Sequence, residues 1–188
     1  MATKAIIFDC FGVLVISKLE LLQNDFPEKA AELRDLSLRS DYGYISRADY
    51  GKKVSELTGI QVDAFESVYW KHNVRNERAI EWVRELKATD DYKIGLLSNI
   101  GREWMGDFLP EDERRELFDD EILSSMVGMI KPDPDIFQLM ADRLGVPASE
   151  CIMIDDLLSN IEGASHIGMQ GIVFGSVMQA RQDLERFL

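Results

Sequence analysis

Short apolar runs recur along the chain and are typical of strands buried in a parallel sheet. The first, residues 4–8 (KAIIF), is β-branched and aromatic; it ends at Asp9, and Gly12 follows as a turn signal. We predict a buried strand here and over each of the later apolar runs. These later runs lie at residues 92–97, 121–124, 151–154 and 170–174.

Amphipathic helical segments lie between these runs. They cover residues 77–88, 134–144 and 160–167, and Gly145, just past the second of them, is the residue type that commonly ends a helix. From about residue 76 onward, strands and helices therefore alternate. Such alternation predicts an α/β core whose parallel sheet carries helices on both faces.

Residues 15–75 break this alternation. The stretch is helical in period, rich in Leu, Glu, Lys and Ala, and contains no run that resembles a buried strand. Ser46, followed three residues later by Asp49, has the spacing of a residue pair that begins a helix. We predict a small helical insertion over 15–75, within a core made of residues 1–14 and 76–188.

Composition narrows the possible partners and the cellular setting. The 188 residues carry a formal net charge of −13, and such a surface repels nucleic acid and anionic membranes, so we expect neither as a partner. No segment has the length of a membrane span. The two cysteines, Cys10 and Cys151, lie in apolar runs, where we expect reduced, buried thiols. These features predict a cytoplasmic protein.

Polar side chains follow three of the predicted strands: Asp9, the pair Ser98–Asn99 and the pair Asp155–Asp156. The carboxyl ends of parallel strands line one crevice, so these carboxylates should converge. Convergent carboxylates repel each other unless a cation neutralises them, and oxygen ligands suit Mg²⁺. Lys131, in the loop GMIKPDP, is a candidate for the same edge, where it would offset the charge of a nucleophilic aspartate and a phosphate.

Other polar and aromatic residues have ordinary explanations beside functional ones. An aspartate pair after a strand commonly caps a helix, so the pair alone does not establish a metal site. Asn160 either begins a helix or orients Asp156 or Lys131 through a hydrogen bond. The tryptophans are expected to pack in the interior rather than to stack on a ligand; they are Trp70, Trp82 and Trp104.

The chain resembles the haloacid dehalogenase-like (HAD) superfamily over essentially its whole length. Four blocks carry the resemblance: IIFDCFGVLV, GLLSNI, MIKPDPDIF and IMIDDLLSNIEGA. It implies a Rossmann-like, three-layer α/β core with an inserted small helical cap of the C1 type, which residues 15–75 would form. The block spacing and the NIEGA stretch are most similar to the subgroup that includes small sugar-phosphate phosphatases.

The resemblance also implies roles for the residues that match these blocks. Asp9 corresponds to the nucleophile, Ser98 to the residue that binds the transferring group, and Lys131 to the lysine of the third block. These three are the predicted catalytic residues. Ser98, Asn99 and Lys131 are the predicted substrate-binding residues.

Mg²⁺ is the cofactor that the resemblance implies. Asp9, the backbone carbonyl of Phe11 and Asp156 would hold the ion, and Asp155 would act through a metal-bound water.

Phe11 departs from the pattern of the family's phosphatases, which usually carry a second aspartate there as general acid and base. Phenylalanine keeps the backbone carbonyl but removes the proton relay, and general acid–base catalysis is worth about 10²–10⁴-fold in rate. Catalysis is then slow, uses another residue, or favours substrates with good leaving groups.

Taken together, the residues and the resemblance favour a Mg²⁺-dependent phosphatase that acts on a small phosphorylated metabolite through an aspartyl-phosphate at Asp9. A 2-haloacid dehalogenase is one alternative: the aromatic Phe11 supports it, but Asp155–Asp156 opposes it because that branch uses no metal. A catalytically weak, ligand-binding or regulatory protein is another. The sequence leaves monomer and homodimer equally open.

Overall fold

A parallel sheet of five strands, in the order β5-β4-β1-β6-β7, organises the molecule. The computed structural model describes residues 2–17, 20–101 and 103–188. Each strand falls within two residues of a predicted apolar run. The strands are β1 (Ala5–Phe8), β4 (Lys93–Ser98), β5 (Asp120–Leu123), β6 (Cys151–Asp155) and β7 (Gln170–Val173).

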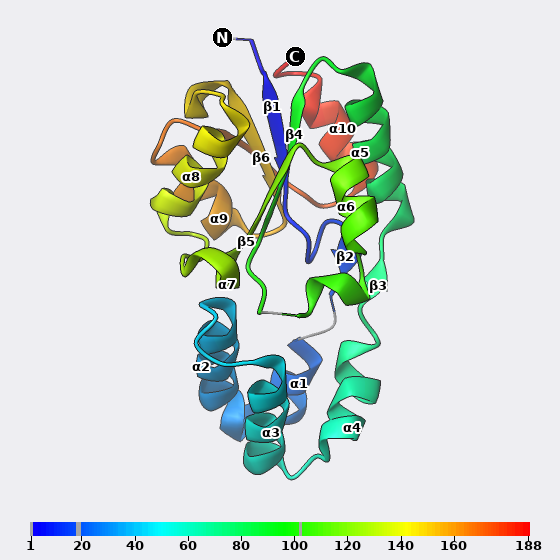
Figure 1. Cartoon of the computed structure of the whole chain (residues 1–188), viewed down its shortest axis with the longest axis vertical. Coiled ribbons are helices and arrows are strands. Elements are labelled where there is room, and N and C mark those ends of the chain that lie inside the picture. Colours follow the sequence, from blue (N-terminus) through cyan, green and yellow to red (C-terminus); the bar gives the residue numbers. More distant parts are fainter. Residues whose placement is uncertain (1, 18–19, 102) are drawn as a thin grey trace.

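Helices cover both faces of the sheet, as the alternation of elements predicts. On one face lie α8 (Pro134–Leu144) and α9 (Leu158–Ser165), and on the other α5 (Glu77–Thr89), α6 (Glu111–Leu117) and α10 (Val177–Leu184) (Figure 1). The residues of β1 are fully buried and alternate between two apolar clusters. Phe8 packs with Trp82 of α5, and Ile7 belongs to the cluster of Phe137 from α8. The core therefore sits on both sides of the strand that leads to Asp9.

Some elements were missed or misplaced by the sequence analysis. Helix α10 was not predicted, although Ser176 and Gln179 form a capping box at its start. Helix α9 begins two residues before the predicted start at Asn160, which is therefore not its first residue. Short connecting helices complete the core: η3 (Met105–Asp107), α7 (Ser124–Val127) and η4 (Ala148–Glu150). None of the described helices is long and apolar enough to cross a membrane.

The segment between residues 20 and 70, which we call the helical lobe, forms the opposite end of the molecule from the two termini (Figure 1). Ser46 accepts a hydrogen bond from the backbone N–H of Asp49, as predicted for the start of a helix. The elements of the lobe are α1 (Glu20–Asp25), η1 (Pro27–Lys29), α2 (Ala30–Asp41), α3 (Arg47–Thr58), α4 (Val62–Phe65) and η2 (Glu66–Trp70).

Two short antiparallel strands, β2 (Val15–Ile16) and β3 (Val74–Arg75), connect the lobe to the core; we call them the stem. The sequence analysis expected no buried strand between residues 15 and 75. Ile16 and Val74 are both exposed, which is why neither strand carries the apolar pattern of the main sheet. Strands of two residues are also too short to show a period.

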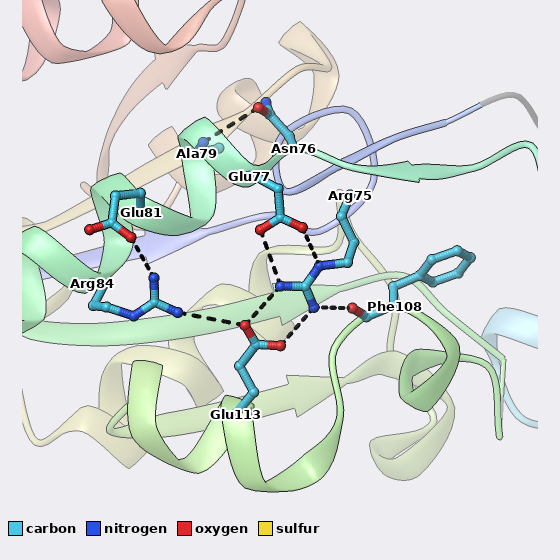
Figure 2. Close-up of polar contacts among 8 residues, drawn as sticks. All are labelled: Arg75, Asn76, Glu77, Ala79, Glu81, Arg84, Phe108 and Glu113. Carbon is cyan, nitrogen blue, oxygen red and sulfur yellow. Dashed lines mark hydrogen bonds and ion pairs between the residues drawn. The ribbon is translucent and has the colours of Figure 1, made fainter.

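Arg75 ties the stem to two helices of the core (Figure 2). Its guanidinium donates to Glu77 of α5 at 2.7 Å, to the carbonyl of Phe108 at 2.6 Å, and to both carboxylate oxygens of Glu113 of α6 at 2.6 and 2.8 Å. Hydrogen bonding from Arg75 lowers the pKa of the Glu113 carboxyl. Bidentate arginine–carboxylate pairs fix orientation as well as position, so the point where the chain re-enters the core is firmly held.

Candidate active site

Three carboxylates meet at the carboxyl ends of neighbouring strands. Asp9 follows β1, Asp155 ends β6, and Asp156 comes next in the chain. One oxygen from each lies within 4.8 Å of the others. Asp9 and Asp155 are buried and Asp156 is half-buried. The parallel register of β1 and β6 brings these residues together, because it pairs Phe8 with Ile154.

Lys131 lies between two of these carboxylates. Its Nζ is 2.8 Å from Oδ1 of Asp9 and 2.6 Å from Oδ2 of Asp155, and its side chain is buried. Asn99 holds the backbone on either side of Lys131, accepting from its N–H and donating to its carbonyl, both at 2.8 Å. The side chain of Asn99 thus positions the lysine, and a contact with substrate stays a prediction.

Asp155 is held by more donors than the sequence indicated. Its Oδ1 accepts from the backbone N–H of Leu157 at 2.9 Å, and Asn160 donates to both of its oxygens at 2.9 and 3.0 Å. The sequence analysis paired Asn160 with Asp156 or Lys131, but its amide donates to Asp155. Asn160 follows Asp155 by five residues and lies in the first turn of α9. Asp155 in turn accepts a hydrogen bond from the ammonium group of Lys131.

Burial governs the electrostatics of this cluster. It raises the pKa of Asp9 to about 7; the charge of Lys131 acts in the opposite direction, and those of Asp155 and Asp156 add to the rise. Burial also disfavours the charged form of Lys131, but Asp9 and Asp155 together raise its pKa above the usual range. One ammonium group cannot neutralise three carboxylates, so a further cation is needed for all three to be ionised at once.

The donor set fits Mg²⁺. Three carboxylates of the described residues converge here, and hard divalent cations of this kind prefer oxygen ligands. The loop after β1 closes directly onto Asp156: Gly12 has a φ of +91°, and a Cβ built on it would lie 2.2 Å from the Asp156 carboxylate. Only glycine avoids both the strained backbone and this overlap. Phe11, whose carbonyl is a predicted ligand, lies in the same loop.

Ser98 is the last residue of β4 and is fully buried. Its hydroxyl has no hydrogen-bond partner among the described residues. A buried, unpaired hydroxyl is costly in a folded protein, about 1–3 kcal/mol, and calls for a partner such as a ligand, an ion or a water. Because Phe8 pairs with Leu96, the ends of β1 and β4 lie together and place Ser98 on the same edge as Asp9. A phosphate oxygen at this edge would satisfy the hydroxyl.

A cavity of about 150 Å³ lies between this edge and the helical lobe. Phe11 and Asn99 form part of its wall on the core side, and Asp41, the last residue of α2, lines it from the lobe. The ring of Phe11 packs against Phe108 and Trp70, with centroids 5.6 and 6.0 Å away. The sequence analysis did not single out Asp41, because no local pattern indicates which lobe residues face the core.

A sequence model described as haloacid dehalogenase-like hydrolase matches residues 3–168. YhcW of Bacillus subtilis (strain 168), named as a presumed phosphatase, is 29% identical over 191 residues, which cover 90% of this chain and 82% of that protein. Acyl-CoA dehydrogenase family member 10 of Mus musculus is 31% identical over 144 residues. That match covers 74% of this chain and 13% of the mouse protein, so the chain spans only a small part of this relative.

Solved structures share the fold. A HAD family enzyme of Bacteroides thetaiotaomicron superposes with a TM-score of 0.79 at 21% identity, covering 94% of this chain and 97% of that one. The same enzyme has been solved in complex with magnesium and inorganic phosphate. A structural match at 21% identity shows only a shared fold. The family model, in contrast, matches the sequence itself over residues 3–168. The chain therefore belongs to the haloacid dehalogenase-like hydrolases.

Proposed function

We propose that this protein is a Mg²⁺-dependent phosphatase that hydrolyses a small phosphorylated metabolite. The observation that carries the proposal is the unpartnered, buried hydroxyl of Ser98 at the edge where Lys131 contacts Asp9. A hydroxyl and an ammonium group beside a carboxylate nucleophile suit the oxygens of a transferring phosphoryl group. The relative named as a phosphatase and the neighbour solved with phosphate agree with this choice.

In the proposed first step, a carboxylate oxygen of Asp9 attacks phosphorus in line with the ester oxygen. The bond from phosphorus to the ester oxygen breaks, and that oxygen departs with the bonding electron pair as an alkoxide or phenolate, which takes a proton from water; an aspartyl-phosphate forms. The Ser98 hydroxyl and the Lys131 ammonium group stabilise the negative charge on the phosphoryl oxygens. Water then attacks phosphorus, releases phosphate and restores Asp9.

The metal site would be built from Asp9, Asp156 and the backbone carbonyl of Phe11, with Asp155 acting through a bound water. Mg²⁺ would supply charge neutralisation between the carboxylates and the phosphate. Asp155 has a second task, since it also holds Lys131. Together with the residues that flank it, the helical lobe makes up the predicted insertion of residues 15–75. It would act as the cap that excludes bulk water. The two free, buried cysteines suit a reducing, cytoplasmic setting.

The decisive experiment measures phosphate release from a panel of phosphate monoesters with Mg²⁺ and after exhaustive chelation. We expect turnover that requires the metal. Asp9→Asn, a nearly isosteric change, should abolish turnover without loss of the folded state. Mass spectrometry of acid-quenched wild-type enzyme should place a phosphoryl group on Asp9; a label on another residue would refute the mechanism.

The same panel should include 2-haloacids, because Phe11 is aromatic, as in the dehalogenase branch. Halide release that survives chelation would establish the dehalogenase alternative instead. Binding of phosphate compounds without turnover would favour a ligand-binding or regulatory protein. Asp156→Ala separates these cases further, since only the metal-dependent phosphatase should lose its activity with that carboxylate.

A further inference from the structure

We propose that the cavity between core and helical lobe holds the leaving group of the substrate, and that this group is a single aromatic ring. The substrates would then be aryl phosphate monoesters rather than sugar phosphates. This inference rests on the proposed phosphatase function and specifies its substrate class. It starts from the juxtaposition of an aromatic-walled cavity with the Asp9 site.

The wall of the cavity is built from rings that hold each other in place. Trp104 of the core lies with its centroid 4.0 Å from that of Trp70, 5.7 Å from Tyr50 and 6.5 Å from Phe65. Phe11 closes the wall toward the site at 6.0 Å from Trp70. All five rings line the cavity. The tryptophans were expected only to pack in the interior; Trp82 does so, whereas Trp70 and Trp104 also face this space.

The size of the cavity fits one ring. Its volume is about 150 Å³, close to that of an engineered apolar cavity of about 150 Å³ that binds benzene. Edge-to-face and offset contacts between aromatic rings stabilise binding beyond burial alone. A planar aromatic group would therefore gain both burial and contacts with the rings of the wall.

A sugar would fit poorly, because most polar groups of the wall are already engaged. The Ser37 hydroxyl donates to the carbonyl of Leu33 at 3.1 Å and lies 3.3 Å from the hydroxyl of Tyr50. The amide of Asn99 is occupied by the backbone of Lys131. A sugar hydroxyl buried without a partner would lose its hydrogen bonds to water and weaken binding. The carboxyl group of Asp41 also lines the cavity and would meet a polar substituent on the ring.

The cavity adjoins the site on the leaving-group side. Phe11 is two residues from Asp9, and Asn99 follows Ser98 directly, so both walls begin where the phosphate would sit. Phe11 also replaces the carboxyl that would protonate a departing alkoxide. A phenolate is a far weaker base than an alkoxide and departs without that proton. Phe11 thus lacks the acidic group and supplies part of the surface that contacts an aryl leaving group, which departs without a proton.

The test compares phenyl phosphate with glucose 6-phosphate and with acetyl phosphate, whose leaving group is small and needs no proton. We expect kcat/KM for phenyl phosphate to exceed that for glucose 6-phosphate at least tenfold. Ser37→Leu fills the cavity and should lower kcat/KM for phenyl phosphate by about 10–200-fold, the range for one misfitted aliphatic group, with a clearly smaller loss for acetyl phosphate. Ser67→Leu, at an exposed lobe position outside the cavity, is the matched control and should leave both substrates within about twofold.

A binding measurement keeps the inference testable without turnover. Calorimetry with Mg²⁺ should find phenylphosphonate bound more tightly than methylphosphonate, and Ser37→Leu should remove that preference while the melting temperature stays near that of the wild type. Equal binding of the two phosphonates, or a preference for glucose 6-phosphate over phenyl phosphate, would overturn the aryl proposal and leave the phosphatase proposal standing. Failure to release phosphate from any ester, with phenylphosphonate still preferred, would instead overturn the phosphatase proposal alone.

Discussion

At the scale of single residues, Gly12 is the position where the backbone and the site constrain each other most closely. Its φ of +91° and the 2.2 Å approach of a built Cβ to Asp156 both exclude a side chain. We predict that Gly12→Ala displaces Asp156 and raises the Mg²⁺ concentration for half-maximal activity by about 10–100-fold, the usual cost of disturbing a ligand's support. A metal titration of activity measures this shift.

The control for this prediction is Gly168→Ala. Gly168 also has a positive φ, +79°, but a Cβ there meets nothing within 4 Å. It should cost stability through backbone strain, of the order of 1 kcal/mol, without changing the metal titration. If both variants shift the Mg²⁺ midpoint equally, strain rather than contact with Asp156 is responsible.

Asp41 gives a prediction about pH. Burial raises its pKa to about 7, with the charge of Lys131 acting against the rise, and its place at the carboxyl end of α2 also disfavours a negative charge. The folded protein therefore holds a proton on Asp41 between its unfolded pKa of 3.8 and about 7, whereas the unfolded chain does not. Stability contributed by this group falls as the pH rises through that window.

Asp41→Asn should remove this dependence. We expect the variant to match the wild type near pH 4 and to exceed its free energy of unfolding by about 4 kcal/mol above pH 7, in chelated buffer. Urea unfolding at several pH values measures the difference. A constant difference across the range would mean that Asp41 does not titrate in this window in the folded protein.

At the scale of elements, the stem depends on Arg75. Removing its guanidinium would leave Glu77 and Glu113 facing each other without the cation that joins them (Figure 2). We predict that Arg75→Met lowers the free energy of unfolding by about 2 kcal/mol, because several charge-assisted hydrogen bonds are lost together. Arg115→Met, which removes an exposed pair with Glu111 inside α6, should cost less than about 0.5 kcal/mol. Equal losses in urea unfolding would contradict a special role for the stem.

The elements also mark how far the sequence alone leads. The strands of the sheet and the carboxylates at their ends were predictable, because short apolar runs alternate with amphipathic helices and parallel strands bring their carboxyl ends to one edge. Asp9, Ser98 and Asp155 share one edge for this reason, whereas Lys131 reaches it from the loop between α7 and α8. Helix α10 was missed because its pattern is short and carries only Ala180 and Leu184 as buried residues.

The cavity was not predictable in the same way. Its wall combines Tyr50 and Phe65 of the lobe with Phe11 and Trp104 of the core, which are far apart in sequence. Which of these rings face each other depends on how the lobe is set on the stem, and helical periodicity gives only the face of each helix, not its partner. The polar contacts that position the lobe against the core follow no local sequence motif.

At the scale of the whole molecule, Asp107 joins the core to the helical lobe. One of its carboxylate oxygens accepts from Nε1 of Trp70 at 2.6 Å and lies 2.8 Å from Nη1 of Arg47. The guanidinium of Arg47 also stacks over Trp104 at 4.4 Å from the ring centroid. Loss of this carboxylate should weaken the contact that keeps the lobe against the core.

We predict that Asp107→Ala opens the lobe and raises KM for phosphate esters about tenfold, because part of the binding free energy must then re-form the closed arrangement. Small-angle scattering should record a larger radius of gyration in the variant. Asp112→Ala removes an exposed carboxylate of α6 and serves as control. An unchanged radius and KM in Asp107→Ala would mean that the aromatic contacts alone hold the lobe.

Because the cavity wall is divided between lobe and core, substrate specificity depends on the equilibrium between open and closed arrangements of the lobe as well as on the fit of the ring. A ring bound in the cavity touches the lobe and the core at once, so its binding free energy shifts the population toward the closed arrangement. Inorganic phosphate, bound by the core alone, would not shift this population. Selection against the wrong ester would then act before chemistry begins, through the time that the lobe spends closed. Water, which attacks the aspartyl-phosphate in the second step, would reach it mainly after the ring has left the cavity.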